Sequence, residues 1–92
     1  SSFMRRVHVL VRGDVHGVFF RVHVRDLAEE CGVNGWVRNV PLGVEVVCEG
    51  NDRAVKKILA FCTAGPSGAQ VKSVEVKEQK YTGEFSSFAI KY

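Results

Sequence analysis

The stretch that most constrains this chain is the run at positions 13–21, which reads GDVHGVFFR. It joins a segment with strand periodicity to a segment with helical periodicity. Its two glycines allow the backbone to approach a ligand closely, and Arg21 stands where the helix would begin. Backbone N–H groups that converge beside a helix N-terminus form a site for an anion, most often phosphate. The run therefore predicts an anion-binding loop.

On either side of this loop the apolar residues recur with the periods of strands and helices. Residues 5–12 alternate as a strand does, and residues 21–31 carry an apolar stripe at helical spacing that ends before Gly32. Asn51 or Asp52 is placed to cap a second helix, which would end near residue 64. Further strands are predicted over residues 33–40, 44–49 and 71–80, with a short last strand after Gly83.

This order of elements, βαββαβ with a short extra strand, predicts an α+β fold. For two helices and four to five strands, the compact packing is one antiparallel sheet with both helices on a single face, a ferredoxin-like sandwich. The first two strands then run parallel through a right-handed crossover, with the third strand between them. We therefore expect the loop that ends at Arg21 to lie beside the end of the second strand, at Arg38 and Asn39.

The length of 92 residues predicts one domain over residues 1–92, with residues 1–3 interpreted as a cloning remnant ahead of Met4. No apolar run approaches the ~20 residues that a bilayer requires, so we expect a cytoplasmic monomer without a membrane partner. The net charge of +3 suits a small anion and does not require a nucleic acid. Three cysteines cannot all pair within one chain, and their spacing fits no zinc site, which favours buried reduced thiols.

Two side chains are candidates for chemistry. The guanidinium of Arg21 presents its donors in a planar fork that suits two phosphate oxygens. Most arginines are simply solvated, but a cation at a helix N-terminus costs about 0.3–1 kcal/mol unless an anion lies between them. Asn39 alone could equally be a turn residue. Its carboxamide both accepts and donates, so it can hold a water while its NH₂ group contacts a phosphate oxygen.

An amide and a guanidinium supply no general acid, general base or nucleophile, so the reaction must need none of them. Hydrolysis of a carboxylic–phosphoric anhydride fits, because a carboxylate whose acid has a pKa of about 4 leaves without a proton. The loose transition state of phosphoryl transfer asks mainly for positioning and charge stabilisation. The three histidines His8, His16 and His23 have no metal-ligand spacing, so no metal site is predicted.

Residues 13–21 resemble the first signature of the acylphosphatase family, and residues 35–39, GWVRN, resemble the second. The likeness extends from about Met4 to the FAIKY ending at residues 88–92. It implies a ferredoxin-like, small free-standing hydrolase that uses no metal or cofactor. Such an enzyme cleaves acyl phosphates, for example acetyl phosphate, carbamoyl phosphate or 1,3-bisphosphoglycerate, into carboxylate and inorganic phosphate. We expect inorganic phosphate also to inhibit the enzyme.

The resemblance also implies roles for individual residues. Arg21 and Asn39 are the expected catalytic residues: Arg21 binds the phosphate with the loop amides, and Asn39 orients the attacking water. The family usually has glutamine where His16 stands, and the hairpin over residues 43–50 is one residue shorter than usual. The expected phosphate-binding residues are His16, Gly17, Val18, Phe19, Phe20 and Arg21.

Two alternatives stay open. The first is a ferredoxin-like module without catalysis, which binds phosphate or another anion, or binds RNA through exposed aromatic residues on its first and third strands. Those strands here carry Val, Leu, His and Glu at the positions where stacking rings would be needed. The chain could also be a carbamoyl-phosphate-handling domain of a larger maturation enzyme, although its short length and its start near Met4 favour a free-standing protein.

Overall fold

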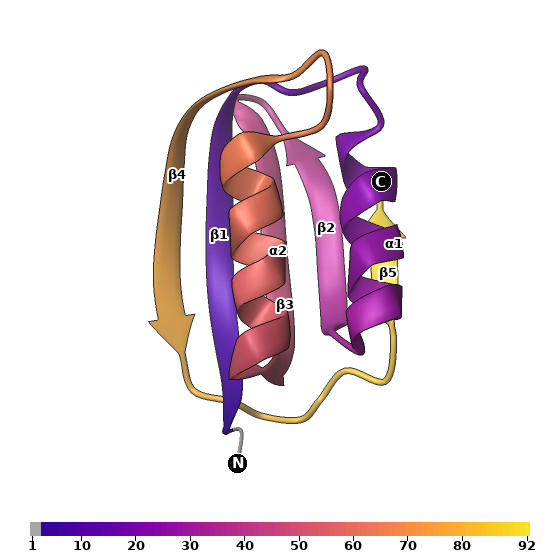
Figure 1. Cartoon of the computed structure of the whole chain (residues 1–92), viewed down its shortest axis with the longest axis vertical. Helices are drawn as coiled ribbons and strands as arrows, with labels where there is room; N and C mark the ends of the chain where they lie inside the picture. The colour runs from indigo at the N-terminus through magenta and orange to yellow at the C-terminus, as the bar shows by residue number, and fades with distance from the viewer. Residues whose placement is uncertain (1–2) are drawn as a thin grey trace.

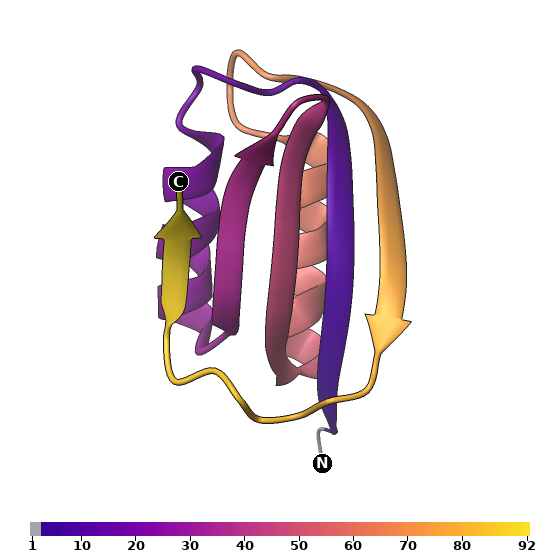
Figure 2. The same cartoon turned by 180° about the vertical axis from the view of Figure 1, so that it is seen from behind.

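The computed structural model describes residues 3–92, so Ser1 and Ser2 of the interpreted remnant lie outside it. Two helices cover one face of a five-stranded sheet (Figure 1), and the view from behind shows the sheet in front of both helices (Figure 2). The predicted ferredoxin-like α+β order is confirmed. The elements are β1 (Met4–Asp14), α1 (Phe20–Cys31), β2 (Asn34–Val40), β3 (Gly43–Asn51), α2 (Asp52–Ala64), β4 (Gln70–Gln79) and β5 (Phe88–Lys91).

The strands lie in the order β4-β1-β3-β2-β5. Strand β3 pairs antiparallel with β1 and with β2, so these two run parallel with β3 between them, as predicted. The expectation of a wholly antiparallel sheet is corrected at one edge, where β5 pairs parallel with β2. The reason is visible in Figure 2: the segment after β4 crosses below the sheet before β5 begins, so β5 runs upward beside β2.

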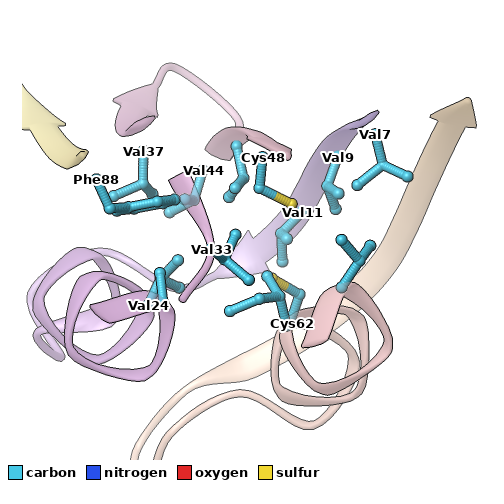
Figure 3. Close-up of a cluster of buried hydrophobic side chains, with 14 of the residues drawn as sticks. Val7, Val9, Val11, Val24, Val33, Val37, Val44, Cys48, Cys62 and Phe88 are labelled. Carbon is cyan, nitrogen blue, oxygen red and sulfur yellow. The ribbon is translucent and has the colours of Figure 1, made fainter. Parts of the chain in front are cut away.

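Small apolar side chains form the core between the sheet and the helices (Figure 3). The predicted alternation of β1 is confirmed, because Val7, Val9 and Val11 are all fully buried. Burial raises the pKa of both Cys48 and Cys62 to about 12, so at neutral pH both are protonated thiols that pack as apolar groups. Both are free cysteines, as is the half-buried Cys31, which agrees with the prediction of reduced thiols.

Particular residues determine where α2 begins and how β1 ends. The Asn51 side chain accepts a hydrogen bond from the Ala54 N–H at 2.8 Å, which confirms one of the two predicted caps of α2. Strand β1 continues past Arg12 through a register shift to Asp14. Gly13 allows this bulge, because a Cβ at that position would lie 2.2 Å from the Gln70 carbonyl oxygen. The loop into α1 begins directly after the bulge.

Candidate active site

The candidate site lies where three parallel strands end beside the start of a helix. The C-terminal ends of strands β1, β2 and β5 lie at the same end of the sheet. Helix α1 begins there, near the end of the chain (Figures 1 and 2). A cavity of about 210 Å³ opens between these elements. It is lined by Val15, Gly17, Phe19, Phe20, Arg21, Val22, Asn39, Ile90 and Tyr92.

The loop that enters α1 is held in an unusual backbone conformation. Gly17 has φ 73°, and Phe19, the N-cap residue of α1, has φ 57° and ψ 30°. The left-handed region costs a non-glycine residue about 1–2 kcal/mol, so this strain at Phe19 is offset by the rest of the structure. Left-handed and right-handed residues in succession, as at Phe19 and Phe20, turn neighbouring N–H groups toward one concave side, where an anion can bind.

The first turn of α1 lacks an acceptor of its own. Within the described chain no side chain caps this helix, and its first turn contains no acidic residue. The first backbone bond at this end joins the His23 N–H to the Phe19 carbonyl at 3.0 Å, which leaves the N–H groups of residues 20–22 without an intrahelical partner. These donors, at the positive end of the helix dipole, suit an anionic ligand.

Arg21 lies on this first turn, half-buried, and lines the cavity. None of the ion pairs among residues 3–92 involves Arg21, so its charge is available to a ligand. Its Cζ atom lies 5.0 Å from the centroid of the Tyr92 ring. Such a cation–π contact contributes about 0.5–1 kcal/mol at an exposed site and restricts where the guanidinium can point.

Asn39 reaches the same cavity from the end of β2. Side chains alternate along a strand, so Asn39 faces the side of the sheet on which Val37 is buried beneath the helices. Asn39 itself is exposed, and its carboxamide makes no hydrogen bond to the described part of the protein. The predicted proximity of Asn39 to the loop that ends at Arg21 is therefore observed.

Four of the six residues expected to bind phosphate line the cavity: Gly17, Phe19, Phe20 and Arg21. The other two do not. The His16 ring turns away, because its Nε2 donates to the Gly43 carbonyl at 2.7 Å and so ties the loop to the β2–β3 hairpin. Val18 packs against the hydrophobic core.

The structure adds residues that sequence reasoning missed. Ile90, in β5, and Tyr92, directly after that strand, line the cavity, and β5 pairs parallel where an antiparallel strand is predicted. Glu49 is also missing from the predicted site: as the neighbour of buried Cys48 on β3 it faces away from the helices, yet it is 3% exposed. It accepts hydrogen bonds from Thr82 and Gly83, in the segment that leads to β5. Neither arrangement has a local sequence signal.

Features of two other kinds, a metal site and a membrane-spanning helix, can be assessed for the described range. Residues 3–92 contain no group of three or more His, Cys, Asp and Glu side chains placed to hold a metal ion. In the same range, neither helix is long and apolar enough to cross a membrane.

Comparisons with known proteins show which family the chain resembles. The acylphosphatase family model matches residues 7–90. An acylphosphatase of Syntrophus aciditrophicus is 52% identical over 90 residues, which cover 97% of this chain and 94% of that protein. The solved structure of an acylphosphatase from Coxiella burnetii superposes with a TM-score of 0.88 at 35% identity, covering 96% of this chain and 93% of that one.

A part of a much larger protein has the same fold. Full-length HypF, solved in a phosphate- and nucleotide-bound form, matches all of this chain with a TM-score of 0.90, but over 12% of its own length and at 22% identity. That likeness concerns the fold alone. The family match over residues 7–90 and the identity to curated relatives over nearly their full length show that this chain belongs to the acylphosphatase family.

Proposed function

We propose that this acylphosphatase holds the phosphoryl group of an acyl phosphate with Arg21 and the loop amides, and positions the attacking water with Asn39. The observation that carries the proposal is the shared cavity: Arg21, on the uncapped first turn of α1, and Asn39, at the end of β2, line the same space. A guanidinium without an acidic partner and a helix N-terminus both favour a bound phosphoryl group.

The composition of the cavity restricts the chemistry. Among the described residues that line it, none carries a carboxyl, imidazole, thiol or amine side chain, and the one phenol, that of Tyr92, has its ring packed against Arg21. Leaving groups that need a proton are therefore poorly served, whereas a carboxylate, whose acid has a pKa of about 4, leaves unaided. This favours acyl phosphates over phosphate monoesters.

The proposed step is one displacement at phosphorus. The oxygen of the water held by Asn39 bonds to phosphorus as the bond from phosphorus to the carboxyl oxygen breaks, and the electron pair of that bond leaves with the carboxylate. A phosphoryl oxygen of the substrate accepts the proton of the water. Arg21 and the N–H groups at the start of α1 stabilise the charge on the phosphoryl oxygens, which is the main demand of a loose phosphoryl-transfer transition state.

Steady-state hydrolysis tests the proposal. The protein is expected to release phosphate from acetyl phosphate and to leave a monoester such as phenyl phosphate essentially intact, with the same rates in the presence of EDTA. Comparable turnover of the monoester would contradict the proposal, because it would require a group that protonates the leaving oxygen, a role that the proposal gives to no residue of the cavity.

The alternative of an RNA-binding module rests on the face of the sheet opposite the helices, where Trp36 lies. Two cations already occupy this ring: Lys91 Nζ and Arg38 Cζ lie 4.4 and 5.2 Å from its centroid. Arg38 Nε is also paired with Glu45 at 2.6 Å, and Arg12 with Glu75 at 3.1 Å. A face whose aromatic ring and arginines are already engaged favours stacking and phosphate binding less than the cavity favours hydrolysis.

A further inference from the structure

The cavity is lined by polar groups and by a larger set of apolar side chains, here called the apolar wall. Gly17, Arg21 and Asn39 supply the polar groups, to which the phosphoryl group and the water are proposed to bind. The rest of the lining is apolar or aromatic and comes from the loop, from α1 and from the end of the chain: Val15, Phe19, Phe20, Val22, Ile90 and Tyr92. A substrate whose phosphoryl group lies on Arg21 would therefore place its acyl group against this wall.

Phe19 is the unusual member of the wall. It is the one non-glycine residue in the described chain with a positive φ, and its side chain is 75% exposed although it is a large aromatic. Phe20, by contrast, is buried in the core and packs edge-on against Phe61, with 5.5 Å between the two ring centroids. Backbone strain is typical of ligand sites, and exposed Phe19 shares the lining of the cavity with exposed Tyr92, so the exposed apolar surface there is more than one isolated ring.

The charges of the cavity point the same way. Arg21 is the one cation in its lining, and the phosphoryl group engages it. A second negative charge on the acyl group would find no partner there and would lose its solvation against apolar side chains. An apolar acyl group removes its own surface from water together with that of Phe19, Ile90 and Tyr92.

We propose that Phe19 is a specificity-determining residue, whose exposed ring, together with Ile90, receives the acyl group and favours aromatic or branched apolar acyl phosphates over small or doubly charged ones. This inference rests on the proposed function, because it needs the phosphoryl group to lie at Arg21. It concerns the binding of the acyl group, which the proposed roles of Arg21 and Asn39 do not address.

The test compares three substrates: benzoyl phosphate, acetyl phosphate and succinyl phosphate, whose acyl group carries a second carboxylate. All three leave as carboxylates of acids with pKa near ~4, so differences report mainly on binding of the acyl group. The wild-type protein is expected to show a kcat/KM for benzoyl phosphate about tenfold or more above that for acetyl phosphate, expressed mainly in KM. Succinyl phosphate is expected to be no better than acetyl phosphate.

Variants then assign the preference to one side chain. Phe19→Gly is expected to lower the ratio of kcat/KM for benzoyl phosphate to that for acetyl phosphate by about tenfold, and Phe19→Leu by less, because leucine keeps an apolar surface. Glycine adopts a φ of 57° without strain, so the variant is expected to fold, which circular dichroism and the Tm check. Leu42→Ala is the matched control: Leu42 is 68% exposed and lies outside the lining of the cavity, so the ratio should not change.

The outcomes separate the two proposals. If all three substrates are hydrolysed but Phe19→Gly leaves the ratio unchanged, or if succinyl phosphate is preferred to benzoyl phosphate, the role of Phe19 is wrong and the proposed function stands. If the folded wild-type protein hydrolyses none of them, both proposals are wrong.

Discussion

Replacement of Glu49 by alanine is expected to destabilise the protein strongly, because this carboxylate holds the segment that leads into β5. Glu49 is 3% exposed and accepts hydrogen bonds from the Thr82 N–H at 2.9 Å, the Thr82 hydroxyl at 3.0 Å, the Gly83 N–H at 3.1 Å and Arg6 Nη1 at 3.2 Å. Hydrogen bonds to buried charged groups are strong but not additive, so we expect a loss of about 3 kcal/mol. For a domain of this size that lowers the Tm by about 12–24 °C.

The effect of Glu49 should depend on pH. Burial opposes its ionisation, but hydrogen bonds from Thr82, Arg6 and Gly83 outweigh burial and hold the pKa of Glu49 below its ordinary value. A carboxyl group whose pKa is lower in the folded state stabilises fully above its unfolded pKa of about 4.3, and that contribution is lost as the pH falls through the folded value. The difference in stability between wild type and Glu49→Ala should therefore be full at neutral pH and shrink below about pH 4.

Urea unfolding followed by circular dichroism, at neutral pH and again near pH 3, measures both effects. Glu84→Ala is the matched control, because Glu84 contacts the same arginine at 2.6 Å but is 55% exposed, where solvent screens the pair. Its loss should be far smaller than that of Glu49→Ala. Equal losses in the two variants, or a Glu49 effect that is the same at both pH values, would refute the reasoning.

Three further perturbations have simpler expectations. Inorganic phosphate should inhibit competitively and raise the unfolding free energy by about 2.7 kcal/mol at a hundred times its Kd; a Tm that ignores phosphate would count against the anion site. Gly17→Ala should lower the unfolding free energy by about 1–2 kcal/mol. The cost is backbone strain alone, because φ is 73° at this position and an added Cβ meets no atom within 4 Å. The same variant should weaken phosphate inhibition. Asn51→Ala should cost about 1 kcal/mol in urea unfolding by removing the cap of α2, with kcat unchanged.

Periodicity in the sequence predicted the elements and their order because it reports directly on which face of each strand or helix is buried. The pairing of β5 could not be predicted in the same way. It depends on contacts between distant residues: the Asn34 side chain donates to the Phe85 carbonyl at 3.2 Å, and the Gly35 N–H to the Ser87 carbonyl at 2.9 Å. No local pattern encodes such pairs, so the parallel pairing of β5 and the places of Ile90 and Tyr92 in the cavity were missed.

The same limit applies to the site. Arg21 and Asn39 could be placed together because the crossover between two parallel strands brings their ends to one edge of the sheet. The ring of Tyr92 against Arg21 depends on β5 and was not foreseen. The direction of the His16 ring was also out of reach, because its partner, the Gly43 carbonyl, belongs to the hairpin. The functional roles of Arg21 and Asn39 stay predictions.

The most direct test of the account measures hydrolysis and phosphate inhibition side by side for wild type, Arg21→Ala and Asn39→Ala, with the fold of each checked by circular dichroism. Both variants are expected to lose about 10²–10³ in kcat for acetyl phosphate. Arg21→Ala should also lose most of its affinity for inorganic phosphate, whereas Asn39→Ala should keep most of it. A folded Asn39→Ala protein with near-wild-type turnover, or an Arg21→Ala protein that binds phosphate as the wild type does, would contradict the division of roles between the two residues.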